Sequence, residues 1–123
     1  MKAGFFICFF FLIFPGAVHS QPARTCLNNI CVSNTARRAS GSNYNWTMTV
    51  QAQAPLSQSR IDSVVYYLHK TFNPRVITLR KKSNNPAYKF DLARTGWGEF
   101  NVLVKVYLHG TRTPVSINHQ LKL

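Results

Sequence analysis

Two short segments of the chain gather residue types that bind ligands. The first, residues 68–74 (LHKTFNP), places His69, Thr71 and Phe72 close together. The second, residues 95–100 (TGWGEF), sets Trp97 between two glycines. Both segments place large aromatic residues at strand ends or in loops, where β-sandwiches carry their binding sites. The two segments are therefore predicted to form a ligand-binding site.

The remaining composition argues against an enzyme. The chain has only three acidic residues: Asp62, Asp91 and Glu99. Mechanisms that need paired carboxylates, and metal sites rich in carboxylates, have almost nothing to use. The sequence contains no Gly-x-Ser-x-Gly elbow, no His-Glu-x-x-His motif and no phosphate-binding glycine loop. A metal site made of His69, His109 and His119 has nothing in the sequence to fix its geometry, and the latter two are expected at the surface or on strands. We expect no catalytic residues, no cofactor and no metal.

The chain is strongly basic. Fifteen Lys and Arg residues against three acids give a net charge of +12. The densest cluster is Arg80-Lys81-Lys82, in a turn-rich stretch. Such a charge favours polyanions, so nucleic acid, an anionic polysaccharide or a membrane surface is an alternative partner. The simpler interpretation of the cluster is a solvated loop.

The first twenty residues have the pattern of a secretory signal peptide. Lys2 precedes an apolar run over residues 5–14, Pro15-Gly16 interrupts it, and small or modest side chains precede Gln21. We expect cleavage after Ser20 and a secreted or periplasmic protein. Because Lys2 leaves with the signal, the mature chain has 14 basic and 3 acidic residues, a net charge of +11. A retained anchor is the alternative, but the run is shorter than the roughly 20 residues that span a bilayer, so we expect no stable membrane anchor.

The mature chain keeps two cysteines, Cys26 and Cys31. An even pair in an exported protein indicates a disulfide, and the Asn28-Asn29 centre of the intervening segment suits a tight turn. Two free thiols are the alternative. Residues 21–43 are polar and show no apolar periodicity, so they are expected to form a loosely packed leader that carries this disulfide loop.

From residue 44 the sequence alternates apolar and polar residues with the period of a half-buried strand. About six strands are expected, without helices, which is typical of an antiparallel sandwich over residues 44–123. The predicted strands cover residues 44–50, 61–69, 75–80, 88–92, 99–109 and 115–123. The binding segments at 68–74 and 95–100 fall at strand ends, where sandwiches carry their sites.

The order of these motifs resembles a YEATS domain. The sequence has His-x-Thr-Phe, then, after another strand, Gly-Trp-Gly-Glu-Phe and a long alternating strand. The second motif is most similar to the prokaryotic branch, and the resemblance covers residues 49–123. It implies an immunoglobulin-like sandwich. In the eukaryotic branch such a domain binds acylated lysine, with the acyl amide held between two aromatic rings from two loops. The resemblance thus implies a flat, neutral ligand group, because a neutral amide leaves water at little cost when its N–H and C=O are both hydrogen-bonded and aromatic rings stack on it.

The resemblance also implies roles for individual residues. Phe72 and Trp97 would be the two rings, and Thr71 would hydrogen-bond to the acyl amide. His69 would support the pocket, Phe100 would form its floor, and the backbone N–H of Trp97 would bind the acyl carbonyl. Glycines on both sides of Trp97 leave its backbone open to close approach. The implied ligand-binding residues are His69, Thr71, Phe72, Gly96, Trp97, Gly98 and Phe100.

Each of these assignments has a structural alternative. Trp97 and Phe72 could pack into the core, and His69 could be an ordinary hydrogen-bonded histidine. The signal peptide and the basic charge also depart from the eukaryotic branch, which reads nuclear histones. The sequence therefore predicts a non-enzymatic recognition module for an acylated ligand or protein, with a polyanion-binding protein as the alternative.

Overall fold

The computed structural model describes residues 23–82 and 85–123, so the expected signal peptide and its cleavage site lie outside the described residues. These residues form eight strands and one short 3₁₀ turn, η3 (Gln58–Arg60). The strands are β1 (Ala23–Leu27), β2 (Ile30–Ser40), β3 (Asn43–Ala52), β4 (Ile61–Tyr67), β5 (Val76–Arg80), β6 (Leu92–Gly96), β7 (Asn101–Leu108) and β8 (Val115–Gln120). In this part of the chain no helix is long and apolar enough to cross a membrane.

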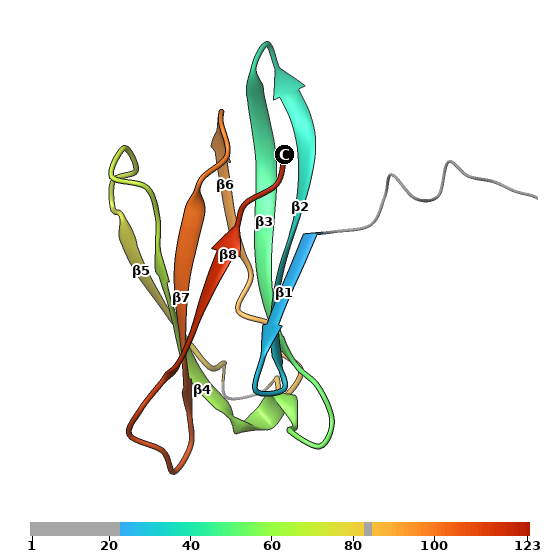
Figure 1. Cartoon of the computed structure of the whole chain (residues 1–123), viewed down its shortest axis with the longest axis vertical. Coiled ribbons are helices and arrows are strands. Elements are labelled where there is room, and N and C mark those ends of the chain that lie inside the picture. The colour runs from blue at the N-terminus through green and yellow to red at the C-terminus, as the bar shows by residue number, and fades with distance from the viewer. Residues whose placement is uncertain (1–22, 83–84) are drawn as a thin grey trace, which may run out of the picture.

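The strands form two antiparallel four-stranded sheets that pack face to face (Figure 1). Their strand orders are β1-β2-β3-β6 and β5-β4-β7-β8. On one side of the sandwich, β1 and β8 lie next to each other. The predicted all-β antiparallel sandwich of immunoglobulin-like type is confirmed.

Alternation along the strands builds the core. Trp46, Met48 and Val50 of β3 are buried, and so are Val102, Val104 and Val106 of β7. Their neighbours in sequence point to the outer faces, because successive side chains of a strand lie on opposite sides of a sheet. The same inner layer contains residues of β4, β6 and β8, namely Val64, Tyr66, Leu92 and Ile117.

The segment before β6 departs from the predicted strand. The sequence predicted extended structure from Tyr88 through Leu92, but the strand begins only at Leu92. Phe90 has φ of 54°, in the left-handed region, which breaks the extended conformation. Its ring is buried against Tyr88, and its carbonyl accepts a hydrogen bond of 2.7 Å from the buried Tyr66 hydroxyl. Burial is the main cause that raises the pKa of Tyr66, so this hydroxyl stays a donor.

The loosely packed leader expected for residues 21–43 was wrong for residues 23–40. These residues form β1 and β2, which pair with each other, and β2 pairs along its length with β3. Ile30 and Val32 point into the core at alternate positions of β2. The next inward position is Asn34. Because this residue is polar, it interrupts the alternation of apolar and polar residues by which a strand is recognised in the sequence. The sandwich therefore begins before residue 44.

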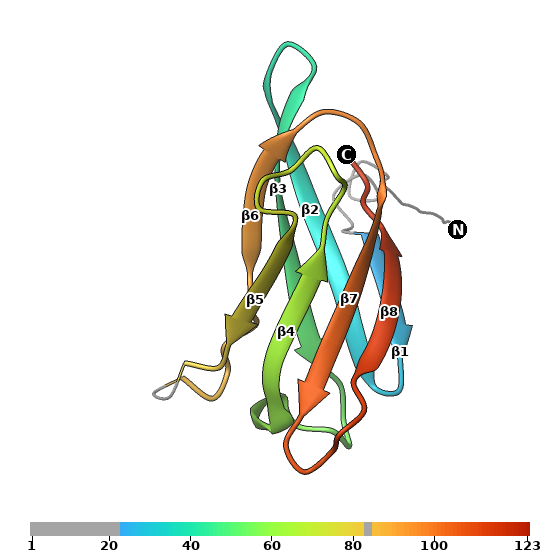
Figure 2. The same cartoon turned by 90° about the vertical axis from the view of Figure 1, so that its left-hand side faces the viewer.

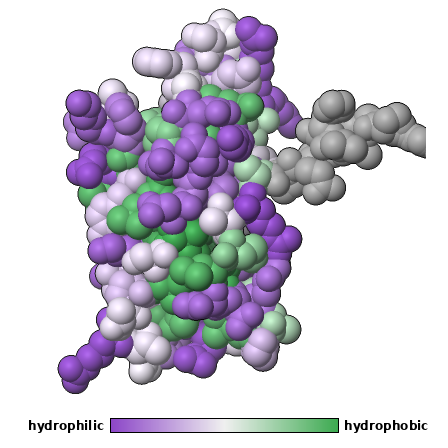
Figure 3. Space-filling view, in the orientation of Figure 1, coloured by the Kyte–Doolittle hydropathy of each residue, from purple (hydrophilic) through white to green (hydrophobic). Residues whose placement is uncertain are grey.

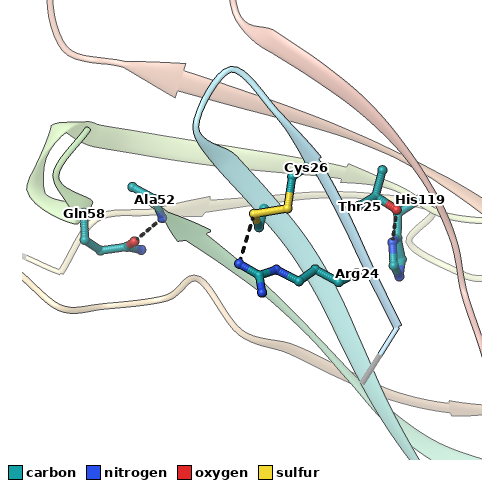
Figure 4. Close-up of a disulfide and its surroundings, with 7 residues drawn as sticks. Arg24, Thr25, Cys26, Ala52, Gln58 and His119 are labelled. Carbon is teal, nitrogen blue, oxygen red and sulfur yellow. Dashed lines mark hydrogen bonds between the residues drawn. A yellow bond between two sulfur atoms is a disulfide. The ribbon is translucent and has the colours of Figure 1, made fainter. Parts of the chain in front are cut away.

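A disulfide and a polar network hold β1 in place (Figure 4). Cys26 and Cys31 are joined across the β1–β2 pair, which confirms the predicted bond. On the other side of β1, the Thr25 hydroxyl lies 2.8 Å from Nδ1 of His119 on β8. Nε2 of His119 lies 2.8 Å from Oδ1 of Asn34. Because the Asn34 amide group donates to the Lys122 carbonyl, Oδ1 is its acceptor and His119 donates from Nε2.

His119 therefore differs from the expected surface histidine, although it does lie on a strand. Only 1% of its surface is exposed. Burial, with a smaller contribution from the nearby charge of Lys122, lowers its pKa below the ordinary value of 6.5. The neutral ring satisfies both of its nitrogens in the network, so it links the two sheets across β1, β2 and β8.

The strand directions define two ends of the sandwich (Figure 2). One end carries the β2–β3 hairpin tip, the β4–β5 loop, the β6–β7 loop and the chain end after β8. We call it the cleft end. The opposite end carries the β1–β2 turn, η3 and the β7–β8 turn.

Candidate functional site: an aromatic cleft between two loops

The cleft end contains an open cleft of about 510 Å³. Its walls come from the β4–β5 and β6–β7 loops, with the start of β3 completing the rim. All seven sequence-predicted ligand-binding residues line it, together with Asn43, Asn73, Thr95 and Glu99. The structure thus brings together two segments that lie about 25 residues apart in sequence. The first joins β4 to β5 within one sheet, and the second runs from β6 in the other sheet to β7.

The β4–β5 loop fixes the hydrogen-bonding role of Thr71. The backbone N–H of Thr71 donates to Nδ1 of His69 at 3.2 Å, and the Thr71 hydroxyl lies 2.9 Å from the same nitrogen. A ring nitrogen that accepts from an N–H carries no hydrogen of its own, so the hydroxyl donates in the second contact. The lone pairs of the Thr71 oxygen remain available to accept a hydrogen bond from a ligand.

An aromatic cluster forms the floor of the cleft. The half-buried Phe72 and Phe100 have ring centroids 5.5 Å apart, and the His69 ring lies 5.8 Å from that of Phe100. Beneath them, the buried Trp46 meets Phe72 and Phe100 edge-on at 5.9 and 6.2 Å. Phe72 therefore belongs both to the edge of the core and to the cleft wall.

Trp97 lies on the surface, which rules out the alternative that it fills the end of the core. Its exposed fraction is 74%, whereas Trp46 beneath the cleft is 2% exposed. Within residues 23–82 and 85–123, no aromatic pair includes Trp97. A large indole so exposed has no packing role that explains it.

The glycines around Trp97 have separate functions. Gly98 has φ of 80°, a conformation that side-chain-bearing residues rarely adopt, so it allows the β6–β7 loop to turn. Gly96 ends β6 against the Phe72 ring, where an added Cβ atom would lie 3.4 Å from Cζ of Phe72. The absence of a side chain at residue 96 leaves the space between the two loops open.

Four lining residues had no role assigned from the sequence, although three of them, Asn73, Thr95 and Glu99, lie within the two predicted segments. The Thr95 hydroxyl donates to Oδ1 of Asn45 at 2.7 Å. Asn43 reaches the cleft because β3 pairs with β6, with Tyr44 opposite Gly96. Glu99 accepts a hydrogen bond of 3.0 Å from the backbone N–H of Leu123 and so attaches the chain end to the cleft rim. Membership of these segments pointed to three of the four residues, whereas Asn43 reaches the cleft through the β3–β6 pairing, which the sequence does not reveal.

The predicted polyanion-binding residues lie away from the cleft, where β5 ends. Arg80 is exposed. Lys81 is half-buried, and its ammonium group donates to the Ser59 carbonyl at 2.8 Å. Lys82 lies over the Tyr88 ring at 5.6 Å. Two of the three cations therefore have contacts within the protein, so this cluster adds little to the support that the overall charge gives a polyanion function. No group of three metal-ligating side chains occurs in the part of the chain that the structure describes.

The fold and the cleft together define a YEATS-type sandwich. The model of the prokaryotic YEATS domain family matches residues 44–122, and the chain belongs to this family. The curated Protein AF-9 homolog of Candida glabrata is 35% identical over 81 residues, which are 63% of this chain and 34% of the relative. The chain thus spans about a third of the length of that relative.

Solved structures agree with this assignment. The Yaf9 YEATS domain bound to H3K27ac is 26% identical, with a TM-score of 0.62 over 76% of this chain and 70% of the other. The Yaf9 YEATS domain recognizing an H3K122suc peptide gives the same identity and TM-score over 84% and 73%. In both cases the ligand named for the neighbour carries an acylated lysine.

Proposed function

We propose that the protein is a non-enzymatic recognition module whose cleft holds an acylated lysine side chain between the rings of Phe72 and Trp97. The observation that carries this proposal is that the exposed Trp97 lines the same cleft as Phe72 and as a threonine whose hydroxyl proton is already held by His69. The acylated ligands of the Yaf9 YEATS structures support the same ligand class.

The polar groups of the cleft match an amide. The Thr71 oxygen accepts from the ligand N–H, because its own proton is directed at His69. The acyl carbonyl needs one donor, for which we assign the backbone N–H of Trp97. This N–H makes no hydrogen bond among the described residues outside the sheet ladders. With both amide groups paired, the remaining gain comes from stacking, about 0.5–1.5 kcal/mol for each aromatic contact beyond the area buried.

The test is a titration with acetyl- and crotonyl-lysine peptides, followed by tryptophan fluorescence and calorimetry. Trp97 reports directly on a ligand over its face, and Trp46 supplies a constant background because it is buried. We expect weak binding, micromolar or weaker, and no response to the unmodified peptide. The proposal is wrong if the folded wild-type protein responds to no acylated peptide.

Trp97→Ala is the decisive variant, and Leu27→Ala is its matched control. Leu27 is also a large exposed apolar residue, but it lies at the opposite end of the sandwich. We expect both variants to stay folded and only Trp97→Ala to lose affinity, by at least about 2- to 12-fold from stacking. Equal affinities of the two variants would show that Trp97 does not contact the ligand.

We further propose that the protein acts outside the cytoplasm. The signal-peptide pattern of residues 1–20 and the Cys26–Cys31 bond both suit an oxidising, exported location. Its natural ligand is then an acylated protein or small molecule of that compartment and not a nuclear histone. The intact mass of the protein recovered after export tests this location, with a mature chain beginning at Gln21 as the expected result.

A further inference from the structure

The surroundings of the cleft are basic. Five exposed cations belong to the segments that surround it: Arg37, Arg38, Lys70, Arg75 and Lys122. We call this set the basic rim. The only acidic residue at this end is Glu99. Asp62 is the second residue of β4, at the opposite end, and Asp91 precedes β6, which begins opposite Met48 in the middle of β3. Figure 3 shows hydrophilic residues gathered around the hairpin tip and the chain end on one face of the molecule.

The loop residues of the basic rim are fixed close to the cleft by their neighbours. Lys70 lies between His69 and Thr71, which both line the cleft. The Arg75 carbonyl accepts a hydrogen bond of 2.8 Å from Leu68, which closes the same loop. Lys122 precedes Leu123, whose N–H is bonded to Glu99 in the cleft wall.

The hairpin residues reach the cleft through the strand register. Arg37 lies opposite Asn45, and Asn45 lies opposite Thr95, which lines the cleft. All three are exposed on the outer face of the sheet. Two strand spacings, about 10 Å, separate the backbones of Arg37 and Thr95. The Debye length at an ionic strength of about 0.1 M is also about 10 Å, so the charge of Arg37 is only partly screened at the cleft. Arg38 follows at the hairpin tip, where its Nε donates to the Gly41 carbonyl at 3.0 Å.

These charges are not neutralised within the protein. Among residues 23–82 and 85–123, the one close contact between an acidic and a basic side chain joins Asp62 to His109, away from the cleft. The rim cations therefore project an uncompensated positive field over the cleft mouth. A lysine-rich peptide that approached it would meet repulsion on several sides, whereas acidic residues would be attracted.

We propose that the partner is an acidic protein segment, in which the acylated lysine is flanked by Asp and Glu residues. This proposal rests on the acyl-lysine function proposed above and adds the sequence context of the ligand. The neutral acyl group enters the cleft, and the acidic flanks lie along the basic rim. Cleft binding selects the modification, while the rim selects the sequence around it and raises the association rate.

The experiment uses three peptides with the same central acyl-lysine and flanks that are acidic, neutral or basic. At low salt we expect the acidic peptide to bind roughly tenfold tighter than the neutral one, and the basic peptide to bind more weakly than both. Raising the salt should bring the three affinities together. Equal affinities at low salt would overturn the proposal. Absence of binding by all three would instead contradict the acyl-lysine function itself.

Charge-reversal variants locate the effect. The variant Lys70→Glu with Arg75→Glu changes the basic rim, and Arg80→Glu with Arg112→Glu makes the same change of charge at exposed residues away from the cleft. The rim variant should lose the preference for acidic flanks, and the distant variant should keep it. Equal losses would overturn the proposal, because the overall charge would then be responsible. The proposal also fails if an acidic peptide without the acyl group binds equally well. It fails as well if the rim variant loses only affinity for a short DNA duplex.

Discussion

His69 holds the hydroxyl of Thr71 through the same nitrogen that accepts the Thr71 backbone N–H. The two contacts determine which way the hydroxyl proton points. They leave the threonine oxygen as an acceptor at the cleft wall before any ligand arrives. Such a preset orientation lowers the cost of ordering the site when the ligand binds.

Thr71→Val should weaken binding of acyl-lysine peptides by about 5- to 150-fold. The substitution keeps the shape but leaves the ligand N–H without an acceptor, and a buried unpaired polar group costs about 1–3 kcal/mol. Thr71→Ser, which keeps the hydroxyl, should bind nearly as well as the wild type. Calorimetry with one acetyl-lysine peptide measures all three proteins. If valine and serine bind alike, the hydroxyl does not contact the ligand.

Serine in place of both Cys26 and Cys31 should lower the free energy of unfolding by no more than about 2 kcal/mol. The closed loop is very short, and the chain-entropy model gives the smallest gains for short loops. Acyl-peptide affinity should not change, because the disulfide lies at the end of the sandwich opposite the cleft. Urea denaturation with and without a reductant measures the effect, and the double variant should be insensitive to the reductant. A reductant effect on the variant equal to that on the wild type would contradict the assignment.

The stability of the fold should decrease in mild acid because of His119. Its pKa in the folded protein is lowered, so the unfolded chain binds the proton more readily. The stability from the neutral ring is complete above its unfolded pKa of about 6.5 and is lost as the pH falls through the folded value. The slope from one such group is at most about 1.4 kcal/mol for each pH unit. Urea denaturation at about pH 7.5 and about pH 5.5 measures this change.

His119→Gln should reduce that pH dependence. A glutamine amide offers one donor and one acceptor, as the neutral imidazole does in its contacts with Asn34 and Thr25. His109→Gln is the control, since His109 is exposed and belongs to no inter-sheet network. If the two variants show the same pH dependence as the wild type, His119 does not couple stability to pH.

The sequence predicted the strands with the longest apolar alternation. β3 and β7 follow this pattern, and the two segments that line the cleft lie at their expected strand ends. The same reasoning missed β2 because its inward row includes Asn34. A buried asparagine is stable only with partners, and those partners, His119 and Lys122, are about 85 residues away in sequence.

The cleft was predictable in its residues but not in its arrangement. Motif order identified Phe72 and Trp97, whereas composition could not decide which of the two tryptophans is exposed. That outcome depends on the β3–β6 register, which places Arg94 opposite the buried Trp46 and brings Gly96 against Phe72. The left-handed Phe90 was equally hidden, since a buried aromatic in alternating sequence usually indicates a strand.

The cleft walls follow strands of both sheets. Thr71 and Phe72 follow β4, whereas Gly96 ends β6 in the opposite sheet and Trp97 follows it. A ligand between the walls would therefore contact residues that follow strands of both sheets. Its affinity should depend on the distance between the two sheets. Core residues that set this distance, such as Met48 and Val104, are therefore expected to influence which acyl groups bind, although both are buried and neither lines the cleft. Relatives with identical loops but different cores are thus expected to prefer acyl groups of different thickness.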